Sequence, residues 1–169
     1  MKAERECIEK DLYEFFDELL RSQGIEDVPL IYNNENGVRP KSPFLSLEFR
    51  SVVSLGMPEK SLVRLEEGKD IQRITQHMRQ HMTMHGFGER GVAALEIIKA
   101  QLNVDSWIDK LRKRKMVIPQ TMETVERPRN FETSREKGAL FDFDLTYQRI
   151  TEVNPGYIEK VQFNPNFIR

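Results

Sequence analysis

The sequence predicts an α+β fold: an antiparallel β-sheet with helices packed on one face and with extended hairpin and terminal arms. Two observations predict this class. Apolar residues recur at helical period near the amino terminus and in the middle of the chain, whereas they alternate at period two in the segments between and after. The alternating segments are joined by turn-like residues, which favours antiparallel pairing. Because the chain has 169 residues, we expect one domain over residues 1–169.

The first predicted element is an amino-terminal helix over residues 8–22. Its apolar residues form one stripe, with acids on the other side: Ile8, Leu12, Phe15, Phe16, Leu19 and Leu20. Gly24 supplies the stop, because glycine tolerates the left-handed conformation that ends many helices. Residues 1–21 hold seven acids and four bases, a local charge of −3.

Strands follow this helix. A short strand at residues 28–32 and a loop rich in Asn, Gly and Pro precede residues 45–57, where the apolar residues occupy odd positions. We expect this odd-numbered face to lie in the core, in one strand or in two collinear strands broken at Ser51. Residues 59–70 are expected to form a turn with Gly68 at its tip.

The centre of the chain predicts a long strand and then two helical pieces. The strand, residues 71–87, places three methionines on one face and three histidines with Thr83 on the other. The central helices span residues 88–115, with Asp105 as the expected N-cap of the second piece. Their inward-facing residues are Val92, Leu95, Ile98, Leu102, Trp107, Ile108 and Leu111.

The remainder of the chain predicts further strands. A strand at residues 116–126 contains Pro119, which indicates an edge or a bulge, and the polar residues 127–138 read as a loop. Carboxy-terminal strands span residues 139–163 around an Asn-Pro-Gly turn, with alternate core residues Phe141, Phe143, Leu145 and Tyr147. Several of these strands exceed the usual five or six residues. We therefore expect their ends to project beyond the core toward partners.

Composition narrows the class of protein. The 26 basic and 27 acidic residues give a net charge of −1, which argues against a dedicated nucleic-acid binder. The single Cys7 forms no intramolecular disulfide, so we expect a protein that is intracellular or indifferent to redox state. We find no apolar stretch typical of a signal peptide and no apolar run long enough to span a membrane, so we expect no membrane partner. The modest hydrophobic content of 38% suggests that neighbouring subunits contribute stability.

Two constellations resemble sites and are better explained by strand alternation. His77, His81 and His85 share a strand face, but neighbours lie roughly 13 Å apart along it, too far to bind one ion at about 2.1 Å. Asp142 and Asp144 lie about 7 Å apart on one face, and the intervening phenylalanines account for the spacing. We expect no catalytic residue, no metal and no cofactor.

The GFGERG motif at residues 86–91 matches the glycine spacing of a dinucleotide-binding loop. It lacks the required βαβ context, because no parallel strand with an acidic end follows about 20 residues later. The glycines are expected to form a tight turn from strand to helix.

One dense basic run stands out, at the end of the central helices. Residues 105–115 carry a charge of +3, although bases are also favoured at a helix carboxyl end by the helix dipole. The alternative is an attachment patch for DNA or for an acidic face of another subunit, such as the amino-terminal helix. The candidate inter-subunit or inter-ring contact residues are Lys110, Arg112, Lys113, Arg114 and Lys115.

Most of the chain resembles the phage neck or tail terminator family. The resemblance rests on MRQHMTMHGFGERGVAALEIIKAQL, on the SPFLSLEF strand after the amino-terminal helix, and on the carboxy-terminal part with Arg135, Glu136, Ile158, Glu159 and Val161. It implies a non-enzymatic virion protein that forms a hexameric ring. Such a ring caps the phage tail tube, contacts tail tube and head-side connector proteins, and passes DNA through its channel. The implied location is the virion neck or tail, after assembly in the host cytoplasm.

Two other classes of function remain open. One is a nucleic-acid-binding module that uses the basic run at residues 110–115 with Tyr147, Tyr157 or Phe163 as stacking platforms. The other is a metal-dependent hydrolase built on His81 and Asp142.

Overall fold

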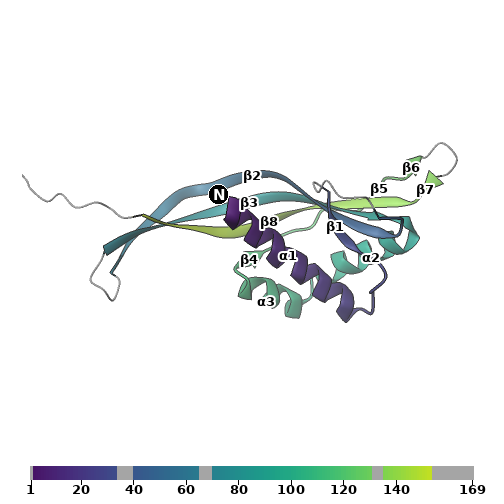
Figure 1. Ribbon diagram of the computed structural model, residues 1–169, viewed down its shortest axis with the longest axis horizontal. Coiled ribbons are helices and arrows are strands. Elements are labelled where there is room, and N and C mark those ends of the chain that lie inside the picture. Colours follow the sequence, from purple (N-terminus) through teal and green to yellow (C-terminus); the bar gives the residue numbers. More distant parts are fainter. Residues whose placement is uncertain (1, 34–39, 65–69, 131–134, 154–169) are drawn as a thin grey trace, which may run out of the picture.

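The chain folds as an α+β protein in which three helices lie beside one main β-sheet (Figure 1). The structure is a computed structural model that describes residues 2–33, 40–64, 70–130 and 135–153. The helices are α1 (Lys2–Ser22), α2 (Gly88–Gln101) and α3 (Asp105–Lys113). The strands are β1 (Leu30–Tyr32), β2 (Phe44–Arg64), β3 (Asp70–Phe87), β4 (Met116–Val117), β5 (Val125–Glu126), β6 (Arg129–Asn130), β7 (Arg135–Glu136) and β8 (Gly138–Val153).

The main sheet has the strand order β1-β2-β3-β8-β4, and β5 also pairs with β8. The long strands pair antiparallel, as predicted, but β1 pairs parallel with β2, so the sheet is mixed rather than wholly antiparallel. A parallel pair cannot be joined by a tight hairpin, because the chain must return to the start of the neighbouring strand before it continues. Strands β6 and β7 form a separate two-stranded sheet.

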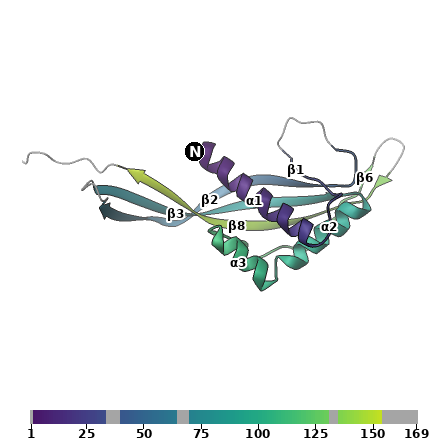
Figure 2. The same cartoon turned by 60° about the horizontal axis from the view of Figure 1, so that its bottom comes forward.

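The long strands β2, β3 and β8 extend well beyond the helices (Figures 1 and 2). At one end they form the body of the molecule, where the helical layer covers one face of the sheet. At the other end they continue as a three-stranded arm, which we define as residues 52–64, 70–80 and 145–153. The predicted extended arm is therefore present.

The core lies between the helices and one sheet face. Phe16 of α1 packs edge-on against Phe143 of β8, with ring centroids 6.1 Å apart, and Phe15 meets Trp107 of α3 at 5.7 Å. Leu95 and Ile98 of α2 are fully buried in the same cluster. The apolar stripes predicted from helical period thus face a common partner, the odd-numbered face of β8.

Helix α1 begins six residues earlier than predicted, at Lys2 rather than residue 8. The first turns carry charged residues rather than an apolar stripe, so hydrophobic periodicity did not indicate them. The predicted stop is confirmed: Gly24 has φ +70°, and the Ile25 N–H donates to the Leu20 carbonyl at 3.0 Å.

Strand β2 changes the face that its odd-numbered residues occupy. Leu45 and Leu47 are buried in the core, but a bulge between Phe49 and Val52 adds one residue and reverses the alternation. Val53 therefore pairs with Arg79 and lies on the opposite face from Leu47. The prediction of a single core face over residues 45–57 is therefore wrong beyond the bulge. The bulge includes Ser51, where one of the two alternatives for this segment placed a break between strands.

Two glutamines of β3 stabilise the irregular parts of β2. The Gln80 side chain donates to the carbonyls of Arg50 and Ser51, at 3.1 and 3.3 Å. Gln76 does the same at the second irregularity, where it donates to the carbonyl of Leu55 at 3.0 Å and to that of Gly56 at 3.3 Å. Carbonyl groups displaced from the regular ladder thus regain hydrogen-bond donors.

Other predicted boundaries need correction. The expected turn at residues 59–70 is strand at both of its ends, because β2 continues to Arg64 and β3 starts at Asp70; Gly68 lies outside the described residues. The predicted strand at residues 116–126 is reduced to β4, β5 and a bridge from Thr121 to Phe143. Pro119 has no N–H for a continuous ladder, which explains the interruption.

The predicted loop at residues 127–138 contains β6 and β7, and β8 already begins at Gly138. The Asn-Pro-Gly turn and the predicted strand at residues 157–163 lie outside the described residues, so the carboxy-terminal prediction is tested only as far as β8.

The strand-to-helix turn predicted for GFGERG is confirmed, with β3 ending at Phe87 and α2 starting at Gly88. A Cβ atom on Gly86 would lie 2.5 Å from the Gly91 carbonyl oxygen, so the backbone segments approach too closely for a side chain. The N-cap of α3 is Val104 rather than Asp105, which lies in the first turn, where a carboxylate is favoured by the helix dipole.

Candidate functional site

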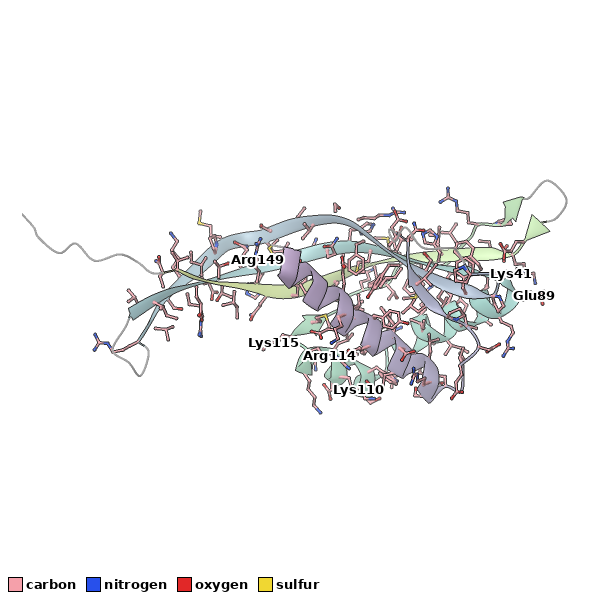
Figure 3. The ribbon with its side chains drawn as sticks, in the orientation of Figure 1. Lys41, Glu89, Lys110, Arg114, Lys115 and Arg149 are labelled. Carbon is pink, nitrogen blue, oxygen red and sulfur yellow. The ribbon has the colours of Figure 1, made fainter. Side chains whose placement is uncertain are left out.

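The basic run lies at the carboxyl end of α3 and in the turn that leads to β4. Trp107 and Leu111 are buried and hold α3 against the core, which leaves the intervening charged residues on the outer side of the helix. Figure 3 shows Lys110 and Arg114 below α1 and Lys115 closer to the arm. The run is thus divided between two surroundings.

Lys110 and Arg114 form ion pairs with α1 of the same chain. Lys110 Nζ lies 2.7 Å from Glu18 Oε1, and an Arg114 guanidinium nitrogen lies 3.3 Å from Glu18 Oε2. The Lys110 ammonium also lies over the Trp107 ring, 3.8 Å from its centroid. The hydrogen bond from Lys110 is the largest effect and lowers the pKa of Glu18 below its ordinary value of 4.5. Desolvation comes next and opposes it, and the hydrogen bond from Arg114 lowers the pKa by a smaller amount.

The complementarity expected between the acidic helix and the basic run therefore exists, but this part of it lies within one chain. Arg112 is also engaged locally, with Asp109 at 3.2 Å on the same helix. Lys113 and Lys115 are exposed, and neither makes an ion pair with the described residues that would neutralise it.

An open hollow of about 290 Å³ lies beside the turn that ends α3. It is lined by two cationic side chains, an imidazole and a phenol together with apolar and polar groups. The lining residues are His77, Arg112, Lys115, Met116, Val117, Thr146, Tyr147 and Gln148. Lys115 has φ +59°, in the left-handed region, so the turn directs the chain from α3 to β4 past this hollow. The hollow combines cationic groups with an aromatic ring at the base of the arm.

The sheet face opposite the helices carries paired polar side chains. Thr83 donates to Asp142 at 2.5 Å, His81 Nδ1 lies 3.0 Å from Asp144, and His85 Nε2 lies 3.2 Å from Glu48. Farther along the arm, Arg73 pairs with Glu152 at 2.9 Å. Each pair joins neighbouring strands, as cross-strand pairs do in antiparallel sheets.

Cross-strand pairing accounts for the spacing of the histidine and aspartate motifs. The three histidines share one strand face as expected, but His81 pairs with Asp144, whereas Asp142 pairs with Thr83. The hydrolase hypothesis requires His81 and Asp142 to act together, but in the structure each of them pairs with a different residue. Among the residues that the structure describes, no group of His, Cys, Asp and Glu could hold a metal ion.

The arm carries exposed apolar residues that the sequence reading assigned to the core or did not single out. Their exposed fractions are high for such side chains: Val53 51%, Met57 93%, Leu62 69%, Ile150 43% and Val153 41%. The only sequence signal for them was the unusual length of the strands.

Within the described part of the chain, no helix is long and apolar enough to cross a membrane.

Comparison with known proteins agrees with these features. The family described as "Phage neck terminator protein" matches residues 8–168, which is almost the whole chain. No curated protein matches the sequence significantly.

Proposed function

Because the chain belongs to the phage neck terminator family, we propose that it forms a ring that caps the phage tail tube and joins it to the neck and head. The family places the protein in the virion neck or tail with a structural role. The single observation that best supports the finer proposal is the arm. Three strands extend beyond the helical layer with apolar side chains exposed, a geometry that suits contact with neighbouring subunits.

The proposed mechanism is geometric and assigns no catalytic step. Identical subunits in head-to-tail contact close into a ring, for which the family resemblance suggests six copies. The polar sheet face, with its alternating acids, histidines and arginines, would line the channel through which DNA passes. The arms and termini would contact the tail tube on one side and the head-side connector proteins on the other. Assembly would take place in the host cytoplasm.

Electron microscopy of negatively stained protein, combined with mass measurement in solution, tests this proposal. We expect rings with a mass equal to a small whole number of subunits, six being the proposed number. A protein that remains a monomer at micromolar concentration, and that neither caps purified tail tubes nor joins them to heads, would contradict it.

The basic run contributes to the proposed contacts through only some of its residues. Lys110 and Arg114 already pair with Glu18, so reversing Arg114 would place two carboxylates together and disturb the fold itself. Lys113 and Lys115 are exposed and point to a contact with an acidic surface of another subunit or ring. We therefore assign the inter-subunit or inter-ring role first to these two lysines, with Arg112 beside them at the hollow.

A charge-reversal pair tests this assignment. The variant Lys113→Glu/Lys115→Glu is expected to weaken ring formation or head–tail joining, with unchanged thermal unfolding. The matched control is Lys41→Glu/Arg127→Glu, which changes the net charge equally at two other exposed basic residues; Lys41 lies at the opposite end of the body from Lys115 (Figure 3). Equal assembly of both variants would remove the basic run from the contact.

One observation favours a second function, nucleic-acid binding. Arg112, Lys115 and Tyr147 line the same hollow, which places cations beside an aromatic ring that could stack on a base. The other proposed platforms, Tyr157 and Phe163, lie outside the described residues. Filter binding of single-stranded DNA should then weaken steeply with added salt and should be lost in Tyr147→Ala; absence of binding at low salt would dismiss this function.

A further inference from the structure

The two outer strands of the arm, β2 and β8, each have one edge along which no described strand pairs for most of the arm's length. Strand β1 pairs with β2 only at residues 45–47, and β4 pairs with β8 only at Tyr147 and Thr146. Beyond these positions, no strand in the described part of the chain pairs with the outer edge of β2 from Val52 onward or of β8 from Gln148 onward. Such edges present backbone donors and acceptors that are suited to pairing with another chain.

The apolar side chains beside these edges match in face and in position along the arm. Leu62 of β2 and Val153 of β8 both pair with Gln72, so they lie at one level and on one face of the sheet. Ile150 of β8 lies on the opposite face, which it shares with Val53 and Leu55 of β2. The two edges thus carry apolar residues on corresponding faces, although they lie on opposite sides of the arm.

A small sheet is stable on its own when it has three or more strands with a hydrophobic face, or when it packs against a helix. The helices cover only the body (Figure 2), so the apolar side chains of the arm beyond Tyr147, among them Ile150, Val153 and Leu62, remain exposed. A second copy of the chain fits both edges, since neither the β8 edge nor the β2 edge is paired by another strand among the described residues. The addition of copies at these edges would repeat indefinitely or close into a ring.

We propose that the β8 edge of one subunit, residues 148–153, pairs with the β2 edge of the next subunit, residues 52–64. Strands β2 and β8 are each antiparallel to β3 and therefore run in the same direction. Rotation about a ring axis that runs roughly along the strands preserves that direction, so the pairing between subunits is parallel. Gly56 and Pro58 interrupt the β2 edge, which leaves two segments to pair, residues 52–55 and 59–64. The inference rests on the proposed ring and specifies its contact.

Engineered cysteines test the contact in the full chain with Cys7 replaced by serine. The variant Leu62→Cys/Val153→Cys places the two thiols two strands apart within one subunit, roughly 9.5 Å between Cα atoms. This separation exceeds the limit of about 7 Å for a disulfide, so any disulfide joins two copies. Ile150→Cys/Val53→Cys reports the opposite face in the same way.

We expect at least one of the two double-cysteine variants, when its rings are oxidised, to give a ladder of covalent oligomers on non-reducing gels. Added reductant should convert this ladder to a single monomer band. The control Leu62→Cys/Val104→Cys retains one arm cysteine and moves the other to an exposed valine between α2 and α3, and it should give no ladder. Hydrogen exchange provides a measurement that does not depend on register: residues 148–153 should exchange more slowly in the ring than in dilute subunits.

The outcomes separate this inference from the proposed function. Rings with neither a ladder nor slowed exchange at residues 148–153 would overturn the edge pairing and leave the ring intact. A protein that is only ever a monomer would overturn both.

Discussion

The ammonium group of Lys110 lies 2.7 Å from a carboxylate oxygen of Glu18, so the basic run of α3 and the acidic helix α1 are joined within one subunit. The Glu18 carboxylate also receives Arg114 at 3.3 Å, and the Lys110 ammonium rests on the Trp107 ring. One acid thus pairs with two of the five bases, whereas Lys113 and Lys115 are exposed.

Removal of the Glu18 charge should loosen the packing of α3 on α1. We expect Glu18→Gln to lower the free energy of unfolding by up to about 1 kcal/mol, since the group is partly exposed and solvent screens the pairs. The control Glu14→Gln removes an ordinary pair with Lys10, at 3.8 Å on the same helix, and should cost less. Urea denaturation measures the free energy of unfolding of both variants. An equal loss of stability would show that Lys110 and Arg114 stabilise Glu18 no more than an ordinary surface ion pair does.

The same contact should give a defined pH dependence. The pKa of Glu18 is lowered in the folded protein by the hydrogen bonds from Lys110 and Arg114, so its contribution is present above the ordinary value of 4.5 and is lost as the pH falls through the folded value. The stability difference between the wild type and Glu18→Gln should therefore be constant from pH 5.5 to pH 8, as an approximate window about a unit above that value, and shrink in acid. A difference that persists at the lowest pH of the folded range would contradict the assignment.

Loss of the Gln80 amide should destabilise the first bulge of β2. Gln80→Leu keeps most of the volume but removes the donor to the Arg50 and Ser51 carbonyls, and we expect a cost of about 1–3 kcal/mol. Gln120→Leu, at an exposed position outside the strands, is the control. Unfolding in urea reports the stability, and hydrogen exchange in β2 reports the local opening; similar costs for both variants would count against the stabilising role of Gln80.

Gly86 and Gly56 should respond differently to substitution. An alanine Cβ at Gly86 would meet the Gly91 carbonyl at 2.5 Å, and we expect a cost of about 1–3 kcal/mol, more for asparagine. At Gly56 no atom lies within 4 Å, but φ is +68°, so alanine should cost about 1–2 kcal/mol and asparagine less. Thermal unfolding of the four variants measures these costs in stability. An asparagine variant at position 86 that is more stable than the alanine variant would refute the steric explanation.

The sequence predicted the elements whose apolar period is uninterrupted. The stripe from Leu12 to Leu20 and the alternation from Phe141 to Leu145 lead directly to the buried faces of α1 and β8. The alternation in β2 was equally regular in the sequence, yet its faces exchange after Phe49. A bulge leaves no mark in a hydrophobic pattern, because the added residue is identified only by its partner strand.

The candidate site was predicted as a charge pattern and not as a geometry. The five bases were found from the sequence, but their division between Glu18 and solvent depends on how α3 packs against α1. Such contacts join residues some 90 positions apart in the chain, and no local rule indicates them. The unpaired arm edges were missed for the same reason, since an edge exists only once the strand order is known.

The register between β3 and β8 runs without interruption from Gln72 and Val153 at the tip of the arm to Phe87 and Gly138 beneath α2. The two strands therefore have no break in pairing between the arm and the body, and we expect the arm and the body to move together as one rigid unit. A neighbour that holds the tip also sets the angle at which the helices, and the lysines at the end of α3, are presented to the next component. In the proposed ring, a small displacement of the arm would therefore be magnified at the far end of the subunit, so closure would require every copy to be correctly placed.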